Sequence, residues 1–133
     1  MNLIKPLNKI NNDTPVIILA GGLGSRLSEE TKLTPKPLVN LGNHSMIFHI
    51  MQIYIKSGFN YFIITTGYKH SNFVNYFEKI LPKKLKEKIK IIKKKQIIEI
   101  IFKNFKVLLV FTGVKTLTAN RIKKCKNLIN KKK

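Results

Sequence analysis

Runs of apolar residues separated by polar segments predict strands alternating with helices along this chain. Residues 16–20 and 61–65 are nearly uninterrupted apolar or β-branched runs that lead into glycine, which is typical of fully buried strands in a parallel sheet. Between them, residues 45–57 repeat apolar side chains at helical spacing, with Ser45 placed to cap the start and Gly58 to close the end. The apolar positions of this predicted helix are Ile47, Ile50, Met51 and Tyr54.

The pattern continues past the second strand. A second helix is predicted over residues 71–81, and Pro82 is expected to end it because proline cannot continue a helical hydrogen-bond ladder. Its predicted apolar face consists of Phe73, Val74, Phe77 and Ile80. Residues 91–102 fit one or two strands and residues 106–112 a further strand, while residues 118–130 fit a last helix. This order predicts an α/β fold, a Rossmann-like parallel or mixed sheet with helices on both faces.

The length of 133 residues allows one compact domain rather than two. We assign residues 14–130 to that domain, residues 1–13 to an N-terminal extension and residues 131–133 to a lysine tail. The apolar runs are far shorter than the ~20 residues of a membrane-spanning helix, so no membrane association is expected. The single cysteine, Cys125, excludes an internal disulfide and fits a reducing, cytoplasmic location.

The charge is strongly positive and uneven. The net charge is +20, and residues 79–133 hold 19 Lys or Arg against 2 acids, whereas residues 1–78 hold 7 against 4. The basic half is nearly all lysine and has no interleaved aromatic platform, while arginine is the better reader of bases and phosphates. A solvated lysine surface is therefore the favoured interpretation, and binding of nucleic acid or another polyanion is the alternative.

The first predicted strand runs into a glycine-rich segment, Leu19-Ala20-Gly21-Gly22-Leu23-Gly24-Ser25-Arg26, and Lys36 follows between two prolines. Glycines after a strand let backbone N–H groups approach a phosphate chain closely. The P-loop pattern is absent, and the dinucleotide fingerprint starting at Gly22 fails because Leu27 stands where its last glycine is required. The segment therefore indicates a phosphate site of another kind.

This pattern, G-G-x-G-[ST]-R followed by P-K-P, resembles the signature of the sugar-phosphate nucleotidyltransferases. Residues 27–31, 49–51 and 67–69 resemble the glucose-1-phosphate cytidylyltransferases within that family. Residues 107–113 and 117–124 resemble the family's next strand and helix more weakly, with Phe111 in place of an expected aspartate and Ala119-Asn120 in place of a glycine pair. The resemblance implies a truncated nucleotidyltransferase domain that reaches only the N-terminal part of the family domain.

The resemblance also implies a reaction and its residues. The family joins a nucleoside triphosphate, here CTP, to a sugar 1-phosphate and releases pyrophosphate. Arg26 would bind the β- and γ-phosphates, and Lys36 would lie between the α-phosphate and the sugar phosphate, because phosphoryl transfer depends on positioning and electrostatics. These two are the expected catalytic residues. The expected nucleotide-binding residues are Leu19, Ala20, Gly21, Gly22, Gly24, Ser25, Gly67 and Tyr68.

The family uses Mg²⁺, but its carboxylate ligands are not expected in this chain, because none of the six acids stands at a strand end with a suitable partner. His44, His49 and His70 lack ligand spacing and are expected on a helix surface or in the core. Three interpretations follow: a truncated or split product that binds nucleotide at most, with an incomplete sugar site; a non-catalytic basic protein; or a gene remnant. A homo-oligomer is left open.

Overall fold

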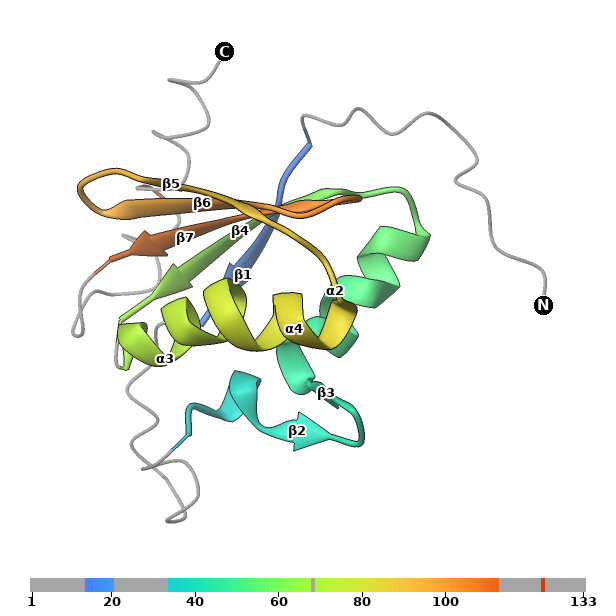
Figure 1. Ribbon diagram of the computed structural model, residues 1–133. Coiled ribbons are helices and arrows are strands. Elements are labelled where there is room, and N and C mark those ends of the chain that lie inside the picture. Colours follow the sequence, from blue (N-terminus) through green and yellow to red (C-terminus); the bar gives the residue numbers. More distant parts are fainter. Residues whose placement is uncertain (1–13, 21–33, 68, 113–122, 124–133) are drawn as a thin grey trace.

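The computed structural model describes residues 14–20, 34–67, 69–112 and 123, and a five-stranded mixed sheet dominates that part of the chain (Figure 1). In spatial order its strands are β1 (Val16–Leu19), β4 (Tyr61–Thr66), β7 (Lys106–Phe111), β6 (Ile97–Ile101) and β5 (Lys90–Lys93). The first three are parallel, and β6 and β5 continue the sheet in antiparallel pairing. The predicted α/β class with a mixed sheet is confirmed.

The other elements come from the two connections on either side of β4. Before it lie the short 3-10 turn η1 (Lys36–Leu38), the hairpin of β2 (Asn40–Leu41) and β3 (His44–Ser45), and helix α2 (Met46–Lys56). After it lies a helical segment made of α3 (His70–Asn75), the π-helical turn η2 (Tyr76–Ile80) and α4 (Leu81–Leu85). Prolines on both sides of Lys36 disfavour a regular α-helix, and a 3-10 turn forms there instead.

Strand β4 is the buried centre of the parallel part, with all six residues buried. Its alternate side chains face opposite sides of the sheet, so Phe62 and Ile64 join one core cluster and Ile63 joins the other. β1 departs from the prediction of a fully buried strand: it is only half-buried, and Leu19 is 43% exposed. The physical reason is that β1 forms an edge of the sheet described here.

The helices α2, α3 and α4 lie on the same side of the sheet (Figure 1). The apolar face of α2 is rotated from the predicted one, because Ile47, Phe48 and Met51 are buried whereas Ile50 and Tyr54 are 37% and 40% exposed. The Ser45 cap is confirmed, since Ser45 Oγ accepts a hydrogen bond from Phe48 N at 3.3 Å. For the second face of the sheet, helices remain a prediction, since residues 113–122 and 124–133 lie outside the described part.

The second predicted helix does not end at Pro82. It continues to Leu85, because the π-helical turn lets Leu81 N donate to Tyr76 O, five residues back. The wider turn accommodates a proline ring that would otherwise clash with the preceding turn. As a result the predicted inward position of Ile80 is also wrong: Ile80 is 41% exposed, and Leu81 is buried in its place.

The remaining sequence predictions have mixed outcomes. One or two strands were predicted over residues 91–102. The structure has two, because this range holds most of β5 and all of β6, which pair as an antiparallel hairpin. The strand predicted over residues 106–112 is confirmed as β7. Within the described ranges, no helix has the length and apolar character required to cross a lipid bilayer.

Candidate functional site

The three parallel strands end at one edge of the sheet, and that edge is held together by backbone hydrogen bonds. Ala20 N donates to Thr65 O at 2.9 Å, and Thr112 N donates to Thr66 O at 2.9 Å. Thr112 Oγ1 donates to the same Thr66 carbonyl at 3.1 Å. The carboxyl edge of such a sheet is where α/β proteins commonly bind ligands, so this edge is the candidate site.

The structure describes part of the site that the sequence predicts. Leu19 ends β1 and Ala20 follows it, Gly67 follows the neighbouring strand β4, and Lys36 begins η1. The register pairs Leu19 with Thr65, so Ala20 and Gly67 are brought close to the same edge. The other predicted residues lie outside the described ranges: Gly21, Gly22, Gly24, Ser25, Arg26 and Tyr68.

Lys36 projects from a backbone that is fixed on both sides. Pro35 and Leu38 are buried, Leu38 N donates to Pro35 O at 2.8 Å, and Val39 N donates to Lys36 O at 3.1 Å. Lys36 itself is exposed, and no carboxylate of the described chain forms an ion pair with it. The geometry therefore provides an anchored cation with a side chain that remains available to an anion.

His70 is a residue of this edge whose contacts the sequence analysis did not foresee. A hydrogen bond joins His70 Nδ1 to Thr66 Oγ1, and the ring lies 5.0 Å from the Phe111 ring. Burial lowers the pKa of His70 below its ordinary value, which favours the neutral imidazole. The available sequence signal was the spacing of four residues between a strand-ending threonine and a histidine in the first helical turn.

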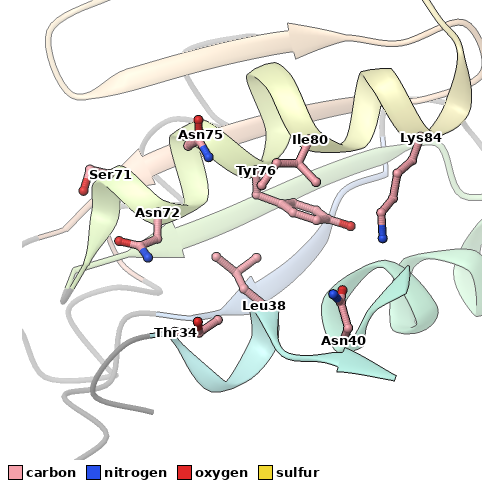
Figure 2. A pocket seen from close by; sticks show the side chains of 9 residues that line it. All are labelled: Thr34, Leu38, Asn40, Ser71, Asn72, Asn75, Tyr76, Ile80 and Lys84. Atoms are coloured by element: carbon pink, nitrogen blue, oxygen red, sulfur yellow. The ribbon is translucent and has the colours of Figure 1, made fainter. Parts of the chain in front are cut away.

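An open cavity of about 500 Å³ lies beside η1, between the η1–β2 segment and the helical segment after β4 (Figure 2). Figure 2 shows Leu38 and Tyr76 in its middle, with Asn40 and Lys84 toward one end and Asn72 toward the other. Tyr76 Oη accepts a hydrogen bond from Ser45 Oγ at 2.7 Å, so the ring is fixed against the start of α2. Burial is the main cause that raises the Tyr76 pKa.

The described residues do not form a carboxylate site for Mg²⁺. No three His, Cys, Asp or Glu side chains gather within the ranges that the structure describes. Of the acids there, Glu78 and Glu99 are ion-paired with Lys93 and Lys106 at 3.7 and 3.5 Å, and Glu87 accepts a hydrogen bond from Lys103 N. These contacts are structural, and we assign no metal ligand among them.

Comparison with known proteins identifies the family. The family model described as nucleotidyl transferase matches residues 15–132. The chain is 51% identical over 65 residues to the glucose-1-phosphate cytidylyltransferase of Salmonella typhimurium, covering 46% of this chain and 25% of that protein. It is 36% identical over 113 residues to a probable glucose-1-phosphate cytidylyltransferase of Bacillus subtilis, covering 85% of this chain and 44% of that one.

A third relative carries a different base in its name. The D-glycero-alpha-D-manno-heptose 1-phosphate guanylyltransferase of Aneurinibacillus thermoaerophilus is 39% identical over 61 residues, covering 46% of this chain and 26% of that protein. This chain therefore spans less than half the length of each of these curated relatives. Because the family model covers nearly the whole sequence and agrees with the mixed α/β sheet, the chain belongs to the nucleotidyl transferase family.

Proposed function

We propose that this chain binds a nucleoside triphosphate, with CTP preferred, at the carboxyl edge of β1, β4 and β7. The observation that carries the proposal is Lys36, an exposed cation on a turn fixed by two buried neighbours. Triphosphates carry concentrated negative charge, and a lysine ammonium acts on it as a compact point charge. The similarity to two cytidylyltransferases supports CTP over other nucleotides.

Arg26 and the glycine loop complete the proposed site. Arg26 would bind the β- and γ-phosphates through charge-assisted hydrogen bonds, and Ser25 would donate to a phosphate oxygen. Backbone N–H groups of Gly21, Gly22 and Gly24 would surround the phosphate chain. Gly67 and Tyr68, following β4, would line the base.

For the whole protein we propose the transfer of a cytidylyl group to glucose 1-phosphate. The sugar phosphate oxygen forms a bond to the α-phosphorus while the bond from that phosphorus to the pyrophosphate oxygen breaks. Lys36 would reduce the repulsion between the two anions that approach each other, and Arg26 would stabilise the charge on the departing pyrophosphate. No metal-dependent step is derived from the described residues.

Calorimetric titration of the full chain with CTP in the presence of Mg²⁺ tests the proposal. Lys36→Ala should weaken CTP binding by about tenfold or more, because a hydrogen bond to a charged group contributes about 1.5–3 kcal/mol. Lys56→Ala removes the charge of another exposed lysine, at the C-terminal end of α2, and should change the affinity less than about twofold. No heat at millimolar CTP, or equal effects of the two variants, would refute the proposal.

The exposed lysines of α4 and β5 favour a second candidate, the binding of a polyanion such as duplex nucleic acid. Lys83, Lys86, Lys90 and Lys93 are all exposed, and the acids are far fewer. Such binding would weaken steeply with salt, because phosphate contacts release counterions. Salt-dependent binding of random duplex that is unchanged in Lys36→Ala would support this candidate, and absence of binding at low salt would exclude it.

A further inference from the structure

We infer that the hairpin of β2 and β3 is an acid-sensitive clasp that fixes the position of the Lys36 turn. His49 and Lys84 hold this clasp closed, and protonation of His44 opens it. The chain runs from Lys36 through η1 directly into β2, so the hairpin constrains the turn from its C-terminal side. The role of the clasp in CTP binding rests on the proposed function, whereas the clasp itself does not.

Two side chains from different helices hold the hairpin by its backbone carbonyl groups. His49 of α2 donates from Nε2 to Leu41 O at 2.6 Å, and Nε2 carries the hydrogen because a carbonyl oxygen only accepts. Lys84 of α4 donates from Nζ to Asn43 O at 2.5 Å, and Figure 2 shows its side chain extending from α4 toward the β2 side. Since α2 precedes β4 and α4 follows it, the hairpin is tied to both helical connections.

Backbone hydrogen bonds connect the clasped hairpin to the turn. β2 and β3 pair in antiparallel register. At the base of the hairpin, Met46 N donates to Val39 O at 2.9 Å, and Val39 N donates to Lys36 O at 3.1 Å. The position of the Lys36 backbone therefore depends on whether the hairpin stays closed.

His44 makes the same hairpin sensitive to acid. Its ring centroid lies 4.8 Å from that of Phe48, and its Nδ1 is buried without a hydrogen-bond partner within the described ranges. In a protonated ring both nitrogens carry hydrogen, so this nitrogen would become a buried donor without an acceptor. The charged and titratable groups that act on the ring are Lys84 from α4 and His49 from α2.

The direction of the acid effect follows from the closed structure. Burial, followed by the Lys84 charge and by His49, lowers the pKa of His44 below its ordinary value of 6.5. The open hairpin therefore binds more protons than the closed one. The contribution of His44 to closure is full above pH 6.5 and is lost as the pH falls through 6.5 toward the closed-state pKa.

The first test measures the clasp without any ligand, by amide hydrogen exchange in the full ¹⁵N-labelled chain. Lys84→Met and His49→Leu should each lower the protection of the Val39 and Met46 amides by about threefold or more, because each removes one hydrogen bond. Lys84→Arg and His49→Gln keep a donor and should restore the protection. Lys83→Met, which changes the exposed neighbour in α4, should alter it by less than about twofold. Unchanged protection of the β7 amides shows that each variant keeps the sheet.

The same experiment tests the acid response. Protection of the two amides, corrected for intrinsic exchange, should fall by at least about twofold in the unaltered chain between roughly pH 7.5 and 5.5. In His44→Gln it should stay constant within about twofold, because the neutral amide does not titrate in this range. An equal fall in both chains would overturn the inference, as would equal protection in Lys84→Met and Lys83→Met or a failure of Lys84→Arg to restore it.

The second test adds CTP and asks whether the clasp acts on Lys36. In calorimetric titration Lys84→Met should raise the CTP dissociation constant by about threefold or more, and Lys84→Arg should return it to within about twofold. A responsive hairpin in a chain that does not bind CTP refutes the proposed function together with the role of the clasp in binding. CTP binding by a chain whose hairpin does not respond overturns this inference alone.

Discussion

Replacement of Ser45 by alanine removes two interactions that meet at one buried oxygen. Ser45 is fully buried, and its Oγ accepts from Phe48 N at the start of α2 and donates to Tyr76 Oη at 2.7 Å, across 31 residues of sequence. Loss of the N-cap costs about 1 kcal/mol. The Tyr76 hydroxyl, left buried without this partner, adds about 1–3 kcal/mol.

The expected destabilisation by Ser45→Ala is therefore about 2–4 kcal/mol, a large part of the roughly 5–15 kcal/mol that stabilises a typical domain. Urea unfolding followed by circular dichroism measures it. Ser57→Ala is the matched control, because Ser57 is exposed and its Oγ donates only to Ile53 O at 3.3 Å, at the other end of the same helix. That control should cost less than about 0.5 kcal/mol.

A double-mutant cycle with Tyr76→Phe isolates the cross-chain hydrogen bond. Tyr76→Phe removes only the hydrogen bond between Ser45 and Tyr76, whereas Ser45→Ala also removes the cap contact to Phe48 N. The coupling energy between the two positions should be at least about 0.5–1 kcal/mol. Additive effects of the two substitutions, or a Ser45→Ala cost as small as that of the control, would show that this bond does not join α2 to the helical segment.

The backbone and His70 yield three further expectations. Lys86 ends α4 with φ 54°, so Lys86→Gly should stabilise by about 0.5–1 kcal/mol in urea unfolding. Gly42 has φ 72° with nothing within 4 Å of an added Cβ, so Gly42→Ala should destabilise by about 1 kcal/mol through backbone strain alone. A loss of stability in Lys86→Gly, or a gain in Gly42→Ala, would contradict the respective expectation. The lowered His70 pKa means that the unfolded chain binds more protons, so its contribution to stability is full above pH 6.5 and falls as the pH drops through 6.5 toward the folded-state pKa. His70→Gln should reduce this decline in thermal unfolding between pH 7.5 and pH 5, and an unchanged pH profile would contradict the assignment.

The sequence predicted strands and helices well where hydrophobic period and local capping agree. The buried runs of β4 and β7 and the Ser45 cap are read directly from residue type, because burial on both faces requires apolar residues at every position. Ile50 and Tyr54 were misplaced because several faces of α2 are apolar, and spacing alone does not decide which one meets the sheet.

For the candidate site, the sequence offers a prediction only where local motifs carry the chemistry. Lys36 is marked by its flanking prolines, and Gly67 by its place after a strand. Pro82 misled because the π-helical turn that accommodates it depends on packing of the whole helical segment rather than on the proline itself. The cavity between η1 and α3 could not be predicted, because its two walls are separated along the chain and meet only through tertiary folding.

The order of strands also bears on how the chain folds. β5, β6 and β7 pair with their neighbours in sequence, whereas β4 reaches β7 only after the intervening helical segment and hairpin have been bridged. Closing a longer loop costs more entropy, so we expect the three-stranded meander to form first and β1 to dock late. In pulsed hydrogen exchange the amides of β6 should gain protection before those of β1, and the reverse order would contradict this. The edge that carries Ala20 and Gly67 would then be completed only in the final stage of folding.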